Sequence, residues 1–368
     1  MTAAEHAGAI LTVDLGAIAA NWRLLRDRLH GAECGAVIKA DAYGLGVRPV
    51  AEALWRAGCR TYFVALAAEG VELRGILGEA DIFILHGVAV GEEADLAARR
   101  LVPVLNTTDE IARWGGFARR QGGAPLRCAV MIDTGMSRLG LEPREAQGLA
   151  ARPDALDGLA LSCVMTHLVA AEERDNPLTA RQLADFNALR AQLPPARASI
   201  ANSAAVFLGP PYALDLARPG AAIFGLAPLV GEPNPMAQVV ELKARILQVR
   251  EIDSPRTVGY GATHRAGAHT RLATVSVGYA DGYLRSLSNR GSGFLGGVRV
   301  GVVGRVSMDL ITFDVTGVPE RYARAGEYLE LIGPHHSPDA LADEAGTIGY
   351  EILTGLGRRY RRAYTGGP

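Results

Sequence analysis

The chain has 368 residues, of which 49% are hydrophobic and 21% charged, so it can bury a large core and is long enough for two domains. A net charge of −1 provides no sustained positive field, which argues against nucleic acid and anionic membrane surfaces as partners. The four cysteines form no CxxC pair and no run has the roughly 18 apolar residues of a membrane span, so we expect a soluble, unexported, cytoplasmic protein without a disulfide framework.

The first expected elements are a strand at residues 9–14 and a helix at 15–29, with Asp14 as its N-cap. From there, strand-like apolar runs alternate with amphipathic segments such as the one containing Val47, Val50 and Leu54. The strand-like runs lie at residues 35–39, 62–66, 82–86, 102–105, 127–133, 159–167, 198–202 and 213–217. Eight strand–helix units predict an α/β fold of the (β/α)8 TIM-barrel type over residues 15–235.

A second domain is expected after the Pro-rich segment "GEPNPM", over residues 236–368. Its pattern is mostly extended, with alternating or apolar runs and one helix suggested at "SPDALADEAG". The sequence therefore predicts a mostly β C-terminal domain. The N-terminal strand in residues 1–14 precedes the barrel and is expected to pair with this domain.

Polar side chains follow several strands of the predicted barrel. In a TIM barrel the carboxyl ends of the strands build the active site. The residues at these ends are Lys39, Arg138, His167, Asn202, Ser203 and Arg218. Each also has an ordinary interpretation: Lys39 as a solvated strand end, His167 as a hydrogen-bonded core histidine, and Arg218 as the partner of a carboxylate such as Asp215. Their convergence on one mouth favours a functional site.

These residue types fit one cofactor. A desolvated lysine loses its proton more readily and can form a Schiff base with a carbonyl. Ser203 and the backbone amides at residues 220–222 follow strands seven and eight, where barrels commonly hold a phosphate. An aldehyde that bears a phosphate is pyridoxal phosphate, and an arginine facing its ring nitrogen would favour proton exchange at Cα over more extensive carbanion chemistry.

Two other motifs predict no functional site. His335 and His336 in "GPHHSPD" predict an exposed loop, since neighbouring histidines without further ligands make a poor metal site, and no metal is expected. The segment "GVVGR" at 301–305 lacks the glycine spacing of a dinucleotide-binding loop.

The motifs taken together resemble a known family. They are "AVIKADAYGLG", "DTGMSRLG", "NSAAV", "ARPGAAIFG", "VGYGATHR", "VGYADGY", "GRVSMDLITFDV" and "YEILTGLGRRY". In order and spacing they are similar to the alanine racemases, over nearly the whole chain. The resemblance implies a (β/α)8 barrel with a C-terminal β domain, pyridoxal phosphate as cofactor, alanine as substrate, and a homodimer with active sites shared between subunits. The product, D-alanine, would suit bacterial wall synthesis.

The resemblance also implies roles for individual residues. Lys39 would form the Schiff base and act as the base on one face of the substrate, and Tyr260 of the partner subunit would act on the other face, since one base cannot easily serve both. His167 and Arg218 would form a linked pair that sets the cofactor nitrogen and the surroundings of Tyr260. The further cofactor residues implied are Tyr43, Asn202, Ser203, Gly220, Ala221 and Arg358. The substrate carboxylate would be held by Arg138 and the backbone of Met308 beside Asp309, and the substrate entrance would be lined by Tyr283, Arg305 and Glu172.

The chain departs from the family at three of these positions. Met131 stands where members commonly carry a modified lysine that orients the arginine, so Arg138 must be held in another way. Glu172 is one methylene longer than the usual aspartate, and Arg358 stands where some members have a tyrosine. Three alternatives stay open. One is a racemase of broader range that also takes serine, and another is a non-catalytic carrier of pyridoxal phosphate, although such carriers lack a β domain. The third is a structural or interaction protein without a cofactor, which would have to match all of these motifs by chance.

Overall fold

The computed structural model describes residues 7–367, which form two compact units. The barrel unit contains residues 18–42 and 46–236, and the β unit contains residues 7–17, 43–45 and 237–367. The chain therefore passes from the β unit into the barrel, contributes residues 43–45 to the β unit, and returns to the β unit after residue 236.

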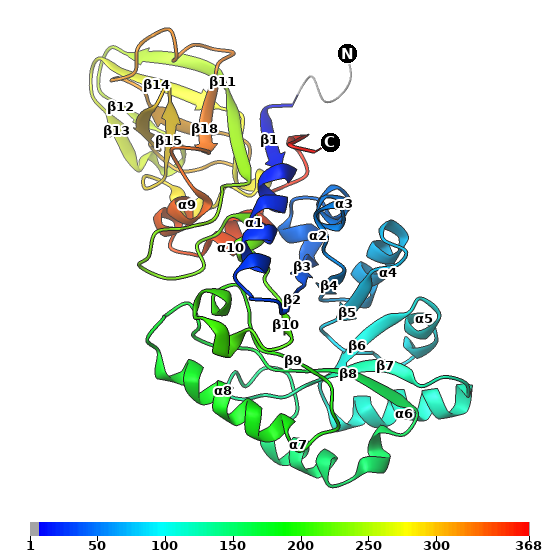
Figure 1. The fold of residues 1–368 in the computed structure, drawn as a ribbon. Helices are drawn as coiled ribbons and strands as arrows, with labels where there is room; N and C mark the ends of the chain where they lie inside the picture. The colour runs from blue at the N-terminus through cyan, green and yellow to red at the C-terminus, as the bar shows by residue number, and fades with distance from the viewer. Residues whose placement is uncertain (1–6, 368) are drawn as a thin grey trace. The chain divides into compact units, whose positions relative to one another are not determined.

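The barrel unit is built on a parallel sheet of seven strands in sequence order (Figure 1). These strands are β3 (Ala36–Val37), β4 (Thr61–Val64), β5 (Asp81–Ile84), β6 (Leu101–Leu105), β7 (Leu126–Met131), β8 (Leu159–Met165) and β9 (Arg197–Ser199). An eighth strand, β10 (Leu216–Ala217), pairs in parallel with β2 (Glu33–Cys34), which directly precedes β3. The ring closes because Asp215 N donates to Ala198 O (3.1 Å) on one side of β10 and Gly35 N donates to Ala217 O (2.9 Å) on the other. The predicted eight-stranded barrel is confirmed.

Helices alternate with these strands. They are α1 (Leu15–Asp27), α2 (Lys39–Tyr43), α3 (Val47–Ala57), α4 (Ala67–Ile76), α5 (Glu93–Ala98), α6 (Thr108–Gln121), α7 (Pro143–Ala150) and α8 (Pro177–Arg190), with the 3-10 turns η2 (Pro153–Leu156), η3 (Ala205–Phe207), η4 (Pro210–Tyr212) and η5 (Ala221–Phe224). Asp14 caps α1, since its Oδ1 accepts from Ala17 N at 2.9 Å. The apolar stripe predicted around Val47, Val50 and Leu54 is the buried face of α3. Only short 3-10 turns stand between β9 and β10.

The β unit contains one sheet of eight strands. Its path is β16–β15–β18–β11–β1–β19, with β14 pairing both β11 and β17. The strands are β1 (Ala9–Asp14), β11 (Val240–Ile252), β14 (Thr270–Val275), β15 (Ser292–Leu295), β16 (Val298–Gly301), β17 (Ile311–Asp314), β18 (Tyr328–Ile332) and β19 (Arg361–Thr365). The long strand β11 holds the sheet together because it pairs with three others, β1, β14 and β18.

The remaining elements of the β unit are short. They are the hairpin β12 (Arg256–Val258) and β13 (His264–Ala266), the 3-10 turns η6 (Tyr260–Ala262), η7 (Tyr279–Asp281) and η8 (Arg285–Leu287), and the helices α9 (Pro338–Ala345) and α10 (Gly349–Thr354). The helix suggested at "SPDALADEAG" is α9, and Ser337 caps it by accepting from Ala340 N. The N-terminal strand β1 lies within this sheet, antiparallel to β11 and parallel to β19.

The prediction for the two neighbouring histidines is half wrong. His335 is half exposed, but His336 is buried, with its Nδ1 atom 2.9 Å from Leu331 O. His336 packs beside Phe294 of β15, which the local sequence could not indicate. Within residues 7–367, no group of three or more potential ligand side chains is placed to hold a metal ion.

The four cysteines are free and buried.

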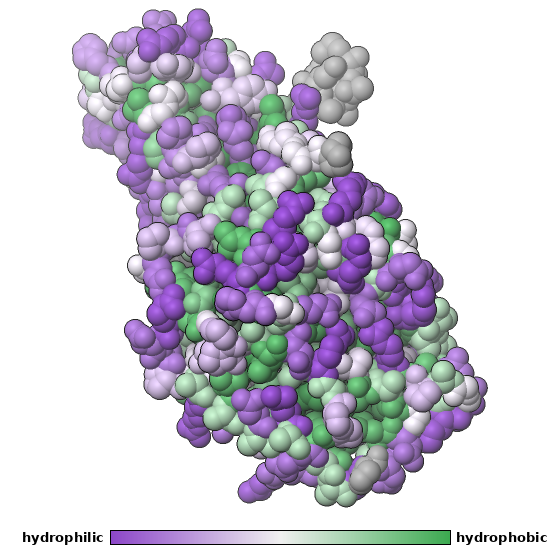
Figure 2. Space-filling model, viewed as in Figure 1, coloured by the Kyte–Doolittle hydropathy of each residue, from purple (hydrophilic) through white to green (hydrophobic). Residues whose placement is uncertain are grey.

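The face of the molecule in Figure 2 mixes hydrophilic and hydrophobic residues. Among the described residues, no helix combines the length and apolar character that crossing a membrane requires.

Candidate active site

Lys39 follows strand β3 and directly precedes a left-handed turn. The three residues after it have left-handed backbone angles, with φ of 54° at Ala40, 53° at Asp41 and 53° at Ala42. Such a turn is sterically unfavourable for residues with a side chain, so it needs support from outside the turn. That support comes from Glu69, whose Oε1 accepts from Ala40 N at 2.6 Å. Within the turn, Asp41 Oδ1 accepts from Val47 N at 2.7 Å and so ties the turn to the start of α3. The Lys39 side chain is thereby held half-buried at the carboxyl end of its strand.

The surroundings of Lys39 favour the neutral amine. Burial and the charge of Arg138 lower the pKa of Lys39 from its ordinary value of 10.5, while Glu69 acts in the opposite direction. An amine with a lowered pKa is the form that attacks a carbonyl carbon. Lys39, at the carboxyl end of its strand, therefore has the properties of a nucleophile.

Arg218 is a buried cation whose recorded partners are neutral oxygens. It is 5% exposed, its Nη2 donates to Thr166 O at 2.7 Å, and its Nη1 donates to Ser199 Oγ. Asp215 is engaged elsewhere, since its Oδ2 accepts from Ala198 N at 2.8 Å. Burial lowers the pKa of Arg218 to about 10, which still leaves the guanidinium charged at neutral pH. Because a guanidinium has five donors, Arg218 can still donate to an acceptor in the barrel mouth.

His167 follows β8 and is half-buried. Burial and the positive charges of Arg218, Arg138 and Lys39 lower the pKa of His167 to about 3. The imidazole is therefore neutral at physiological pH. The three cations, predicted from the ends of three other strands, thus all act on His167.

Ser203 and the turn after β10 form an anion-binding arrangement. Ser203 Oγ is buried and accepts from Gly220 N at 3.0 Å and from Ala222 N at 3.2 Å. Because Ser203 Oγ accepts both bonds, its own proton remains for another acceptor. Gly220 is the N-cap of the 3-10 turn η5, so the Ser203 hydroxyl lies at the N-terminal end of that turn. Asn202, the residue before Ser203, stabilises the local turn, because its Oδ1 accepts from Ala205 N at 3.0 Å.

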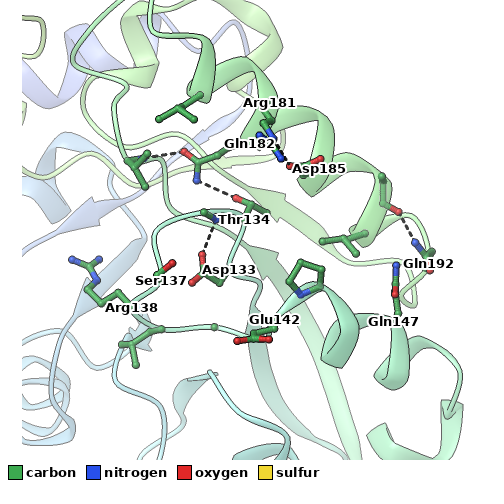
Figure 3. A pocket seen from close by; sticks show the side chains of 18 residues that line it. Asp133, Thr134, Ser137, Arg138, Glu142, Gln147, Arg181, Gln182, Asp185 and Gln192 are labelled. Carbon is green, nitrogen blue, oxygen red and sulfur yellow. Dashed lines mark hydrogen bonds and ion pairs between the residues drawn. The ribbon is translucent and has the colours of Figure 1, made fainter.

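The loop that carries Arg138 is held by hydrogen bonds of Asp133 and Thr134. Asp133 Oδ1 accepts from Gly135 N and Met136 N, both at 2.8 Å. Thr134 Oγ1 lies 2.8 Å from Thr166 Oγ1 and accepts from Gln182 Nε2 at 3.1 Å (Figure 3). Arg138 itself is exposed. Met131 is buried under this loop and provides apolar contact only, so polar support comes from Asp133, Thr134 and Gln182.

A cavity of about 940 Å³ lies beside this loop, between α7 and α8 (Figure 3). Arg138 and Gln182 line it, but Lys39, His167 and Arg218 do not. The cavity is therefore distinct from the barrel mouth where the amine and the buried arginine lie.

Two predicted site residues of the β unit, Tyr260 and Met308, are exposed. Tyr260 in η6 is 72% exposed and Met308 is 54% exposed. The backbone at Met308 is fixed, because Ala280 N donates to Met308 O at 3.0 Å. Arg359 reinforces it by pairing with Asp281 through two bonds of 2.6 and 2.7 Å and with Asp309 at 2.7 Å.

The remaining predicted residues fall into two groups. Arg305, Arg358 and Glu172 are exposed, and the Arg305 guanidinium lies over Gly261, beside Tyr260. Tyr43 is buried in the β unit, with its ring centroid 6.1 Å from that of Tyr350. The predicted set is thus divided between the two units.

Tyr283 does not fit a substrate entrance. It is 3% exposed, and burial raises the pKa of its hydroxyl, which has no hydrogen-bond partner within the described part of the chain. The side chain packs in the core of the β unit with Leu242, Leu287 and Ile352. Tyr279, four residues earlier, is 42% exposed and its amide donates to Ser307 O at 3.0 Å, so Tyr279 has the position that an entrance requires.

Sequence reasoning missed two supporting residues, Glu69 and Gln182. Gln182 is buried and bonds Thr134, the carbonyl of His167 (3.0 Å) and the amide of Val169 (3.0 Å). It shares the buried stripe of α8 with Thr179, Phe186 and Leu189, so a polar residue at a core position was the available signal. Glu69 lies in the first turn of α4, where an acidic residue is expected as part of a helix cap, so nothing in the sequence indicated a further role.

Comparison with known proteins identifies the family. A model of the alanine racemase N-terminal domain matches residues 13–228, and a model of the alanine racemase C-terminal domain matches residues 239–364. The chain belongs to the alanine racemase family. Among its relatives, it is 53% identical to the alanine racemase of Rhodospirillum rubrum over 98% of this chain and 97% of that protein. It is 47% identical to the catabolic alanine racemase of Mesorhizobium japonicum over 98% of this chain and 94% of that protein.

Solved structures of alanine racemases share the whole fold. The enzyme from Bartonella henselae, with covalently bound pyridoxal phosphate, has a TM-score of 0.94 at 39% identity, covering 97% of this chain and 99% of that one. The biosynthetic alanine racemase of Pseudomonas aeruginosa has a TM-score of 0.90 at 35% identity, covering 98% and 99%. The family suggested by the sequence motifs is thus confirmed over both units.

Proposed function

We propose that the protein is an alanine racemase that interconverts L-alanine and D-alanine with pyridoxal phosphate as cofactor. The observation that carries the proposal is a half-buried amine of lowered pKa, Lys39, electrostatically coupled to a neutral His167 that also faces the buried cation Arg218. The donor set of the barrel suits the cofactor: Lys39 for the aldehyde, Ser203 with the turn at Gly220 and Ala221 for the phosphate, and Arg218 for the ring nitrogen. When bound, pyridoxal phosphate withdraws electrons from Cα of an attached amino acid and so makes its proton exchangeable.

The chain's own residues would limit this chemistry to proton exchange. Arg218 remains charged and can only donate, so it favours an unprotonated ring nitrogen and a weak electron sink. His167, neutral at physiological pH, adds no second charge beside it. Tyr43, Asn202 and Arg358 complete the proposed cofactor site.

Inversion at Cα needs two proton carriers on opposite faces. We assign one face to Lys39 Nζ and the other to Tyr260 Oη of the partner subunit. The high exposure of Tyr260 supports this assignment, since a tyrosine that serves a neighbouring subunit must project from its own. In this proposal the protein is a homodimer, and each active site takes residues from both chains.

The substrate carboxylate is assigned to Arg138 and the backbone at Met308, next to Asp309. A guanidinium fork matches a carboxylate in two parallel hydrogen bonds. Arg305 and Glu172 are assigned to the entrance, with Tyr279 in place of Tyr283. We further propose that residues 15–235 are the cofactor-binding barrel and 236–368 the β-rich domain with the strand of residues 1–14, and that the enzyme supplies D-alanine for peptidoglycan in the cytoplasm.

The test is to follow the circular dichroism of L-alanine incubated with the holoprotein. We expect the signal to decay to zero, Lys39→Ala to abolish the decay, and borohydride reduction to leave the cofactor adduct on Lys39 in mass spectra. An adduct on Lys243, the only other lysine of the sequence, would refute the assignment. Serine as a competing substrate separates an alanine enzyme from a racemase of broader range.

A further inference from the structure

The carboxylate of Glu69 binds three backbone amides at the ends of two neighbouring barrel strands. Its Oε2 accepts from Ala65 N at 2.8 Å and from Leu66 N at 3.0 Å, just after β4. Its Oε1 accepts from Ala40 N at 2.6 Å, directly after Lys39. Glu69 lies in the first turn of α4, so one side chain ties that helix start to the turn that carries the nucleophile.

The bond to Ala40 has a specific mechanical effect. Ala40 is the first left-handed residue after the strand, and a left-handed residue with a side chain costs about 1–2 kcal/mol. A charged acceptor on its amide fixes the peptide plane between Lys39 and Ala40 and therefore the direction in which the Lys39 side chain leaves the backbone. Capping of α4 alone requires only the bonds to residues 65 and 66.

Glu69 also acts on the charge of Lys39. The charged and titratable groups that face this amine are Arg138, Glu69 and His167, and His167 is neutral at physiological pH. Burial and Arg138 lower the pKa of Lys39, and Glu69 is the one acidic group that raises it. Removing the Glu69 charge should therefore leave the amine less able to hold a proton.

We propose that Glu69 is a positioning residue for Lys39: its carboxylate holds the left-handed turn behind the lysine, and its charge offsets that of Arg138 at the amine. The proposal rests on the assignment of Lys39 as the cofactor-binding lysine and a proton carrier. It gives Glu69 two effects on the reaction, although Glu69 touches neither substrate nor cofactor.

The chain contains a matched control, Glu110. Glu110 occupies the same place in α6, and its carboxylate likewise accepts from three amides at the ends of neighbouring strands, those of Asn106, Thr107 and Val88. No lysine lies in that turn. Glu110→Gln should therefore reproduce the loss of capping in Glu69→Gln without any effect on Lys39.

The test uses the full chain freed of cofactor and trace labelling of amines by an acid anhydride, with mass spectrometry of the lysine peptides. The sequence has two lysines, and Lys243, which is half-exposed and paired with Glu241 at 2.6 Å, serves as the internal reference. We expect Glu69→Gln to shift the labelling midpoint of Lys39 to lower pH, so that the ratio of Lys39 to Lys243 labelling near neutral pH rises at least about threefold. Glu110→Gln should leave both midpoints unchanged.

Kinetics of the reconstituted proteins provide the second measurement. Glu69→Gln should lower kcat by about tenfold or more with a smaller change in KM, because the misplaced amine affects proton transfer more than substrate binding. Glu110→Gln should lose the same thermal stability but keep kcat. Glu69→Asp, which keeps the charge and shortens the arm, should restore the labelling midpoint more fully than kcat.

The possible outcomes distinguish a failure of the Glu69 inference from a failure of the proposed function. Equal behaviour of Glu69→Gln and Glu110→Gln in labelling and in kcat would reduce Glu69 to a helix cap and overturn the inference. A wild type without racemase activity whose Lys39 midpoint still shifts in Glu69→Gln would refute the proposed function and leave the Glu69–Lys39 coupling standing. If Glu69→Gln fails to fold, Glu69→Asp decides: unchanged kcat in that variant contradicts the positioning role.

Discussion

The side chains at the barrel mouth form a group of mutually repelling cations. Lys39, Arg138 and Arg218 all lower the pKa of His167, and Arg138 lowers that of Lys39. Such a group is unfavourable in the protein alone, where bringing like charges together costs free energy. It becomes favourable when an anion enters, which is what a phosphate ester and a carboxylate substrate bring. The cluster of basic side chains thus favours the binding of anions at the barrel mouth.

His167 gives this arrangement a measurable pH dependence. Its pKa is about 3 in the folded chain, below the unfolded value of about 6.5. Between these values the unfolded chain binds more protons, so the contribution of His167 to stability is fully present above about pH 6.5 and is lost as the pH falls toward about 3. We expect the cofactor-free wild type to lose about 1 kcal/mol more stability than His167→Gln between about pH 7 and 5, allowing for solvent screening.

Urea unfolding at the two pH values checks this expectation. The same substitution at the exposed His86 controls for the loss of an imidazole as such. A wild type and a His167→Gln variant that lose stability in parallel on acidification would show that the imidazole is not held neutral by its neighbours.

Among the elements, the left-handed turn of α2 carries the most strain. Ala40, Asp41, Ala42 and Tyr43 all have positive φ, although none of them is glycine. The turn persists because Glu69 and Asp41 bind its amide and the following helix start. It begins directly after Lys39, which lies two residues beyond the end of β3.

Substitutions at Ala40 should therefore split by sign. Glycine enters the left-handed region without steric cost, so Ala40→Gly should be neutral or stabilising by up to about 1 kcal/mol. Valine is disfavoured there, and Ala40→Val should destabilise by about 1–2 kcal/mol more than Ala20→Val, which costs only helix propensity on the exposed face of α1. Chemical denaturation of the three variants measures the difference, and equal tolerance of valine and glycine at residue 40 would contradict a left-handed turn.

At the scale of the whole molecule, the proposed catalytic set is divided between two compact units. Lys39, His167 and Arg218 belong to the barrel unit, and Tyr260 and Met308 to the β unit. Tyr260 and Met308 are both exposed, so both side chains are accessible to a partner. A dimer in which each β unit serves the other chain's barrel would satisfy both observations.

Mixed dimers test this division directly. Lys39→Ala and Tyr260→Phe chains should each be inactive alone, but a mixed dimer regains one complete site. Random exchange of equal amounts should recover about a quarter of the wild-type activity, because half of the dimers are mixed and each has one of two sites intact. Absence of recovery, with subunit exchange shown by native mass spectrometry, would place both residues in the same chain's site.

The sequence by itself determined the barrel and the residues at its mouth. Alternation of strand and helix periods is local, and in a barrel every strand's carboxyl end faces the same way, so Lys39, Arg138, His167, Ser203 and Arg218 could be grouped without coordinates. Local signals likewise located the cap at Asp14 and the stripe of α3. The family motifs then added Tyr260 and Met308, which no periodicity indicates.

Only the tertiary structure decided which side chains are covered and what supports the turns. Tyr283 and Tyr279 lie four residues apart in one motif, yet one is buried in the core and the other exposed, because burial depends on Leu242 and Ile352, which are distant in sequence. The same reason made His336 a buried residue and left Glu69 and Gln182 unnoticed: their partners, Ala40 and Thr134, stand 29 and 48 residues away. Secondary structure and strand-end chemistry follow from neighbouring residues, whereas burial and long-range hydrogen bonds exist only once the chain has closed its barrel and folded its sheet.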